Sequence, residues 1–213
     1  RDVAQNHLLQ LVTAIAMEQP ESFTKESVRD SRAEVMKAIR IIKPEDVTQS
    51  VIRGQYASYS KEADVSDTSR TETFVAMKLY IDTPRFNDIP FYVQAGKKME
   101  TDFVEISLIF KQTCHILFRE YGCPEIGNVL TFRIQPDEGI HLRTIPKKPG
   151  ATLVLQPVNM HFTYKEAFGR QGADAYEKIL LDILQDDQIL FNRSDELEYS
   201  WQFISQIMEG WKD

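Results

Sequence analysis

The hydrophobic pattern of this chain is helical at both ends and strand-like in between. Near the N-terminus, four apolar residues recur at i, i+3, i+4 and i+7, which is the spacing of one helical face. These residues are Leu8, Leu11, Val12 and Ile15. The spacing predicts a helix over residues 1–17, which ends before Gln19-Pro20 because the residue preceding a proline disfavours helical backbone.

A second helix is predicted over residues 27–41, where apolar residues again follow one helical face. Ser27 and Asp30 resemble a capping box at its start, with aspartate in place of the usual glutamate. Residues 44–47 predict one short helical turn, and the polar segment 58–69 predicts a loop.

The hydrophobic period changes to that of β-strands from residue 74 onward. Six segments are rich in aliphatic and aromatic residues, and several of them alternate apolar with polar positions. These segments are residues 74–81, 91–95, 104–110, 130–135, 140–145 and 153–162. The connections between them are mostly short, which favours antiparallel pairing, and Pro136–Gly139 has the composition of a hairpin turn.

Helical periodicity returns near the C-terminus. One helix is predicted over residues 174–184, and a last one over residues 194–208 with Ser194 as its N-cap. In the first of these helices we expect the apolar side chains to point inward. They are Tyr176, Ile179, Leu180 and Ile183.

The order of these elements predicts an α+β fold, with a large and mostly antiparallel sheet and helices packed on one face. The sheet is expected to have six to nine strands, and few helices are available to cover it. A sheet of that size with one open face would expose an apolar patch. We therefore expect a homodimer formed through the sheet.

Composition narrows the class of protein. The chain has 213 residues, 42% hydrophobic and 27% charged, which is typical of one sizeable globular domain. A net charge of −7 argues against nucleic-acid binding, and we expect no membrane partner because the apolar runs are short. Cys114 and Cys123 lack zinc-ligand spacing, so we interpret them as reduced thiols of a cytoplasmic protein.

The strongest candidate for catalysis is His7, which lies at the edge of the first apolar stripe. Such an imidazole would be half sheltered, and histidine titrates near neutral pH, so it is suited to act as a general base. The alternative is that His7 merely covers the edge of the stripe. The other histidines have no nucleophile or metal-ligand partner at recognisable spacing, and we interpret them as structural. They are His115, His141 and His161.

A second candidate site follows the predicted strand 91–95, where Gly96 precedes Lys97 and Lys98. Glycine permits unusual backbone angles or close approach of a ligand, and a lysine just past a strand can reach a phosphate or sugar hydroxyls. The same pattern also occurs in ordinary solvated turns. Phosphate-binding loops, Walker motifs and dinucleotide fingerprints are absent from the sequence.

Several short segments together resemble glucose-6-phosphate dehydrogenase, in the order of that family and over nearly the whole chain. They are residues 1–10, 28–30, 53–56, 71–74, 90–92 with 96–97, 133–138, 174–177 and 187–193. They resemble only the family's C-terminal domain. The resemblance thus implies one C-terminal domain over residues 1–213, with the family's Rossmann domain absent from this chain, so that the fragment alone is expected to be inactive.

The resemblance also implies a reaction, which belongs to the pentose phosphate pathway. Glucose 6-phosphate would be oxidised to 6-phosphogluconolactone, with hydride passing from C1 to NADP, a cofactor bound mainly by the absent domain. His7 would take the proton from the C1 hydroxyl, while Asp2 and Lys97 would contact the substrate. On a regular α-helix Asp2 would lie roughly 140° around the axis from His7, so we do not expect it to be the partner of the histidine.

The sequence departs from the family pattern at Asp102, where many relatives carry a basic residue five positions after the lysine. Either Lys98 substitutes for it or substrate affinity is weaker. Arg133 and Arg143 match part of a second, structural NADP site found in some relatives. Two alternatives to an enzyme domain stay open: a non-catalytic module that dimerises through its sheet, and a stand-alone sugar-phosphate binder.

Overall fold

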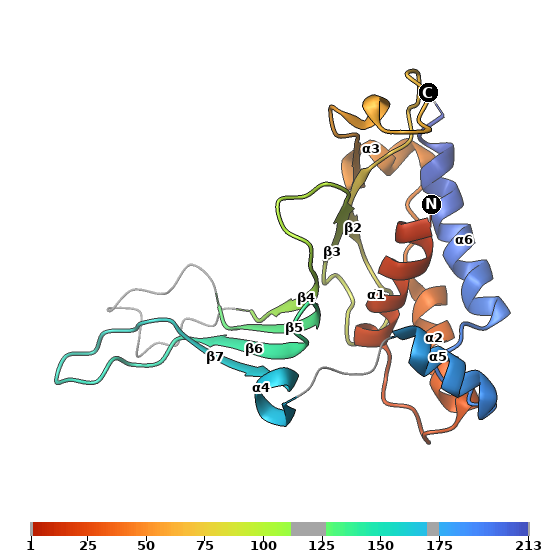
Figure 1. The fold of residues 1–213 in the computed structure, drawn as a ribbon. Coiled ribbons are helices and arrows are strands. Elements are labelled where there is room, and N and C mark those ends of the chain that lie inside the picture. Colours follow the sequence, from red (N-terminus) through yellow and green to blue (C-terminus); the bar gives the residue numbers. More distant parts are fainter. Residues whose placement is uncertain (1, 112–126, 170–174, 213) are drawn as a thin grey trace. The chain divides into compact units, whose positions relative to one another are not determined.

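The computed structural model describes residues 2–111, 127–169 and 175–212. The chain divides into two compact units, of which the first comprises Arg1–Met99 with Ile179–Asp213 and the second comprises Glu100–Lys178. Each unit contains one antiparallel sheet, and helices follow or precede the strands (Figure 1). The predicted α+β class and antiparallel pairing are therefore confirmed. The strands form two sheets of three and four strands, however, and the assignment of residues 1–213 to one domain stays a prediction.

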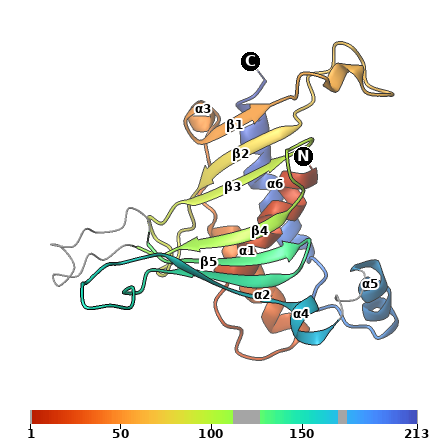
Figure 2. The ribbon, with the colours of Figure 1, turned by 60° about the vertical axis from the view of Figure 1, so that its left-hand side comes forward.

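The first unit is built from helices packed on a three-stranded sheet. Its strands are β1 (Val51–Gly54), β2 (Phe74–Leu79) and β3 (Phe91–Gly96), in the order β1-β2-β3 (Figure 2). Its helices are η1 (Val3–Leu8), α1 (Leu9–Ala16), α2 (Lys25–Ala38), η2 (Pro44–Asp46), α3 (Val47–Ser50), η3 (Tyr59–Lys61) and α6 (Ser194–Glu209). Strand β1 was not predicted from the sequence, because a strand of four residues is too short to show a clear period.

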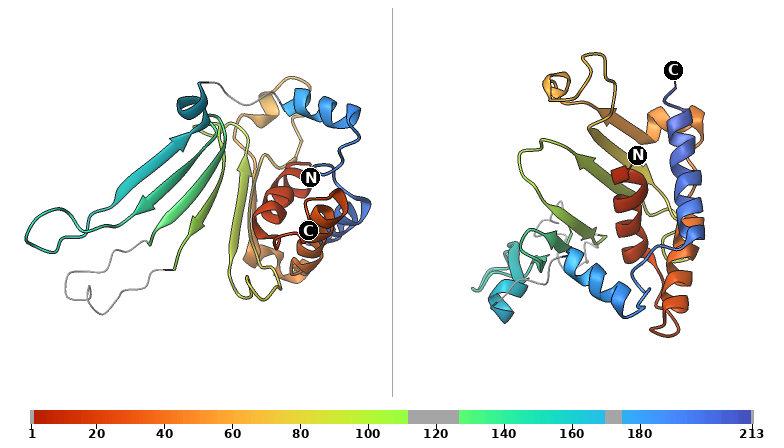
Figure 3. Two further views of the ribbon diagram at one scale, coloured as in Figure 1. Left: turned by 90° about the horizontal axis from the view of Figure 1, so that it is seen from below. Right: turned by 45° about the vertical axis from the view of Figure 1, so that its right-hand side comes forward.

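One hydrophobic core joins these elements. Helices α1, α2 and α6 lie on the same side of the sheet (Figure 3), and their apolar faces meet the inward side chains of β2. The largest fully buried apolar side chains are Leu9, Met36, Leu79, Ile81, Phe203 and Ile207. Each contributes about 1.5–3 kcal/mol by leaving water. The core thus fixes η1, α6 and the sheet as one body.

The limits of the second helix differ from the prediction. Helix α2 begins at Lys25, and the N-cap is Thr24, whose hydroxyl accepts the Ser27 N–H at 3.4 Å. The predicted capping box at Ser27 and Asp30 is therefore wrong. The helix ends at Ala38 because Ile39 is extended and forms a bridge with Ile81, so tertiary pairing overrides the local helical pattern.

The second unit is a four-stranded sheet. Its strands are β4 (Val104–Ile109), β5 (Val129–Gln135), β6 (Gly139–Thr144) and β7 (Val158–Thr163), followed by the short helix α4 (Tyr164–Phe168). The predicted hairpin between β5 and β6 is confirmed. Its Gly139 has no space for a side chain, because an added Cβ would overlap the backbone carbonyl oxygen of Phe162 on β7.

Helix α5 (Ala175–Leu184) forms where the sequence predicts it, but its apolar side chains do not point inward. The four residues expected to be buried are all exposed. They are Tyr176, Ile179, Leu180 and Ile183. The hydrophobic periodicity thus predicted the helix correctly, but the predicted burial of its apolar face is wrong.

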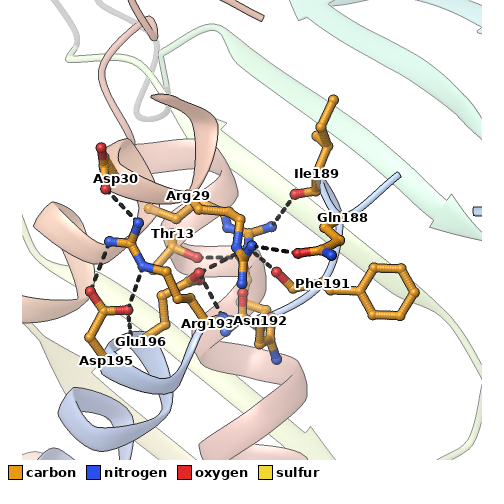
Figure 4. Close-up of polar contacts among 12 residues, drawn as sticks. Thr13, Arg29, Asp30, Gln188, Ile189, Phe191, Asn192, Arg193, Asp195 and Glu196 are labelled. Atoms are coloured by element: carbon orange, nitrogen blue, oxygen red, sulfur yellow. Dashed lines mark hydrogen bonds and ion pairs between the residues drawn. The ribbon is translucent and has the colours of Figure 1, made fainter. Parts of the chain in front are cut away.

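Helix α6 begins at a group of polar contacts, and Figure 4 shows those around Arg193 and Glu196. Ser194 is the first helical residue and Arg193 occupies the N-cap position, so the prediction of Ser194 as N-cap is wrong by one residue. The Glu196 carboxylate accepts the backbone N–H of Arg193 at 3.1 Å and pairs with Arg32 of α2 at 3.0 Å. Arg32 is buried and Glu196 is fully buried.

Further contacts extend this pair into a network. Arg32 also donates to the backbone carbonyls of Ile189 at 3.2 Å and Phe191 at 2.8 Å. The guanidinium of Arg193 bonds both Asp195 oxygens at 2.8 Å, which lowers the pKa of that carboxyl, and it reaches Asp30 of α2. The segment before α6 is therefore held to α2 from both sides.

We expect Glu196→Gln to destabilise the protein by about 3 kcal/mol, because it leaves the Arg32 guanidinium buried without its counter-charge. The matched control is Glu198→Gln, which removes an exposed carboxylate from the same helix and should change stability by less than about 0.5 kcal/mol. Urea unfolding of both variants measures the difference. Equal losses for the two would contradict a structural role for the buried pair.

Candidate functional site

The segment that carries His7 is not a regular α-helix. Residues Val3–Leu8 form the π-helix η1, which passes into α1 at Leu9. A π-helix places its hydrogen bonds between residues five apart, whereas an α-helix places them four apart, and π turns occur often at functional sites. The predicted single helix over residues 1–17 is thus two helical forms joined end to end.

The wider turn brings Asp2 and His7 to the same side of the helix. The imidazole Nε2 lies 3.9 Å from a carboxylate oxygen of Asp2, and the two side chains are 66% and 79% exposed. The expectation that Asp2 points away from His7 is therefore wrong, because residues five apart align in a π-helix but not in an α-helix. The expectation of a half-sheltered imidazole is also wrong, since His7 is open to solvent.

The opposite side of η1 is held by polar side chains that were not predicted as site residues. Gln5 donates through Nε2 to the Ser200 hydroxyl of α6 at 2.7 Å, and both residues are buried. Asn192 donates to the Asn6 side-chain oxygen at 3.3 Å. The only local signal is two amide residues directly before His7, which does not by itself indicate a distant partner.

Lys97 is the residue directly after β3, the strand that lies against η1. Its backbone N–H bonds the Thr73 carbonyl at 2.8 Å, which fixes the turn, while its side chain is exposed. Among the residues that the structure describes, none forms an ion pair with the Lys97 ammonium. This cation is therefore available to an anionic group from outside the chain.

Lys98 has a different environment from Lys97. Its ammonium pairs with Glu62 of the neighbouring loop and lies 5.0 Å from the centre of the Tyr56 ring. The hydrogen bond from Lys98 lowers the pKa of Glu62, and the same contact raises the pKa of the lysine. Lys98 is thus already neutralised within the protein and is a poor substitute for a second substrate-binding base.

Gly96 is favoured by close packing rather than by unusual backbone angles. A Cβ at this position would lie 2.7 Å from Met99 Sδ and 3.0 Å from Phe74 Cδ2. The left-handed residue of this turn is Lys98, with φ of 54°. The glycine therefore permits the tight turn that presents Lys97.

The remaining basic candidates lie on the second unit. Arg133 pairs with Glu105 at 3.0 Å and stacks on the Phe103 ring, so its charge is already used. Arg143 lines a shallow hollow on one face of the sheet together with His141 and His161. The two imidazoles are cross-strand neighbours with ring centres 6.3 Å apart.

No group of three or more metal-ligating side chains is found in the described ranges. Cys114, Cys123 and His115 lie outside the described residues. Within those ranges, no helix has the length and apolar character needed to cross a membrane.

Comparison with known proteins gives consistent matches over the whole chain. The profile of the family described as "Glucose-6-phosphate dehydrogenase, C-terminal domain" matches residues 1–213. The chain is 39% identical to glucose-6-phosphate 1-dehydrogenase of Borreliella burgdorferi and 38% identical to that of Chlamydia muridarum, with 100% and 99% of this chain covered. These matches cover 46% and 43% of the two relatives, so the chain spans less than half of their length.

Solved structures agree with the sequence matches. The fold is similar to a structure described as glucose-6-phosphate dehydrogenase in complex with its substrate glucose-6-phosphate, with a TM-score of 0.88 and 34% identity. That match covers 100% of this chain and 44% of the other. A glucose-6-phosphate 1-dehydrogenase from Mycobacterium avium gives a TM-score of 0.85 at 29% identity, covering 98% of this chain and 43% of its own.

Gly96→Ala is expected to destabilise the first unit by about 1–3 kcal/mol, because the added methyl overpacks the space beside Phe74. Gly54→Ala is a matched control, since Gly54 is paired with the same Phe74 from the other side and its Cβ would make only ordinary contacts, the nearest at 3.7 Å. That variant should be neutral or up to about 1 kcal/mol more stable. Urea midpoints compare the two, and equal stability of both variants would refute the packing argument.

Proposed function

This chain belongs to the family of glucose-6-phosphate dehydrogenase C-terminal domains, and on that premise we propose that the complete protein oxidises glucose 6-phosphate to 6-phosphogluconolactone with NADP. The observation that carries the proposal is the family match over residues 1–213. The resemblance of the segments around His7, Asp2 and Lys97 supports assigning the site to these residues. The isolated chain is proposed to be inactive, because the cofactor would be held mainly by the part of the complete protein outside these residues.

His7 would act as the general base. Its imidazole would accept the proton of the C1 hydroxyl as hydride leaves C1, and NADP supplies the hydride acceptor. Solvent exposure of His7 supports this role, because a base has to come within hydrogen-bond reach of a substrate from outside the chain. Asp2, on the same side of η1, would accept hydrogen bonds from sugar hydroxyls.

Lys97 would bind the substrate electrostatically. Its exposed side chain, at the end of a strand that lies against η1, is suited to an anionic sugar phosphate. Lys98 is engaged by Glu62, so we propose that it does not replace the basic residue that many relatives carry at the position of Asp102.

A homodimer through the four-stranded sheet is the partner arrangement we propose. Strand register places aliphatic and aromatic residues together on one side, here called the apolar face. It comprises Ile106, Leu108, Leu130, Phe132, Ile140, Leu142, Met160 and Phe162. A face of this kind supports self-association, and it equally suits the alternative in which the chain is only a dimerisation module.

His7→Asn in the complete protein should lower kcat by ~10²–10⁴ while changing the KM for glucose 6-phosphate little, because it removes the proton acceptor and keeps much of the side-chain shape.

Lys97→Ala should show the opposite pattern and mainly raise KM, since a lysine bound to the substrate acts alike in ground and transition states.

Steady-state kinetics and thermal melting of the same preparations test these roles. If His7 only covers the apolar stripe, His7→Asn lowers Tm and leaves kcat near that of the wild type. That outcome would remove the general-base assignment and favour the non-catalytic dimerisation module.

Light scattering should find the complete protein to be at least dimeric at micromolar concentration. Met160→Lys, which places a charge on the apolar face, should shift it toward monomer. Ile109→Lys is the matched control, because register places this exposed residue on the opposite face with Val129 and Arg143. A monomeric wild type, or equal effects of the two lysines, would contradict a dimer through this face.

A further inference from the structure

The two residues before His7 both bond to the C-terminal part of the chain. Gln5 reaches Ser200 on α6, 195 residues away in sequence, and Asn6 accepts from Asn192. Gln5 and Ser200 are almost completely buried, with exposed fractions of 5% and 0%. A long polar side chain is rarely buried without a specific partner, so this contact is a defined feature of the packing.

The Gln5 contact is the first of two consecutive hydrogen bonds, which are here called the relay. The amide of Gln5 donates to Ser200 Oγ at 2.7 Å, and that hydroxyl donates in turn to the Leu197 carbonyl at 2.8 Å. Ser200 therefore accepts from η1 and donates within its own helix at the same time. This arrangement fixes the hydroxyl, and through it the position of Gln5, more tightly than one free hydrogen bond would.

The relay fixes the side of η1 that is turned away from His7. Gln5 points to α6 and His7 points to solvent, close to Asp2. In a regular α-helix, Asp2 and His7 would instead lie roughly 140° apart around the axis, which is more than a third of a turn. The contacts that hold η1 in the π form, and that fix its rotation about the helix axis, therefore determine the direction of the His7 imidazole.

We propose that Gln5 and Ser200 are positioning residues for His7, holding η1 so that the imidazole and Asp2 face the same substrate. This proposal rests on the function proposed above. Neither residue contacts the substrate; both act through His7. Their loss should therefore lower kcat, because a small misplacement of a reacting group is costly even when the mutated residue is distant.

The test uses the complete protein and steady-state kinetics with glucose 6-phosphate and NADP. Ser200→Ala should reduce kcat by about 10- to 100-fold and change the KM for the sugar phosphate less than about threefold. Ser205→Ala, an exposed serine on the same helix, is the matched control and should keep wild-type kcat. Wild-type kcat in a folded Ser200→Ala protein would overturn the proposal.

A double variant separates positioning from stability. Ser200→Ala alone leaves a buried amide without its acceptor, whereas Gln5→Met with Ser200→Ala removes both polar groups and should recover much of the lost Tm. If the relay positions His7, kcat stays low in the double variant although Tm recovers. If the relay is merely structural, kcat recovers together with Tm, and the proposal fails.

A comparison of His7→Asn with the double variant His7→Asn, Ser200→Ala tests whether the relay acts through His7. The second substitution should lower the residual kcat by less than about twofold, because the imidazole that Ser200 positions is already absent. A full additional loss would show that Ser200 acts on something other than His7 and would overturn the proposal. Failure of the proposed function has a different signature, since His7→Asn alone would then leave kcat unchanged.

Discussion

A charge pair buried between α2 and α6 is the constraint on which the arrangement of the first unit depends. Arg32 and Glu196 are 164 residues apart in sequence, and neither charge is tolerated in an apolar interior without the other. A structure that buries either charge must therefore bring α2 and the start of α6 together in one register. A buried pair of this kind adds little net stability compared with apolar packing, so we interpret it chiefly as a device that specifies one arrangement.

The position that this pair gives to α6 also determines a contact beside the candidate site. Glu196 and Ser200 are four residues apart and lie on one face of α6, so fixing the first directs the second toward η1. Ser200 receives Gln5, and Gln5 is followed two residues later by His7. The exposed imidazole of His7 is in this way connected to Glu196, one of the most deeply buried groups of the unit.

Local patterns in the sequence were sufficient for most helices and strands and for the α+β class. They were insufficient wherever the decisive contact is distant. The apolar stripe that begins at Leu8 predicts a helix but contains no sign of the π turn, which is accompanied by a bond between Gln5 and a residue nearly the whole chain away. Likewise, every described strand except β1 is visible in the sequence, but membership in one of two sheets is set by pairing partners. His7 and Lys97 could be named as candidates from their local patterns, but an ordinary structural explanation was open for each, and their roles were predicted only because several short motifs together resemble one family.

The π-helix has a consequence for how this segment tolerates insertions and deletions. Its turn contains one residue more than an α-helical turn, so it can be regarded as an α-helix with a single inserted residue. Removing one residue between Val3 and Gln5 would restore α-helical pairing and leave Asp2 and His7 four residues apart. Residues four apart lie on one face of an α-helix, so Asp2 would stay on the side of His7. The meeting of these two side chains thus depends on helix form and spacing together: five residues suit the π form and four suit the α form, and a one-residue gap in an alignment of this segment does not by itself separate the pair.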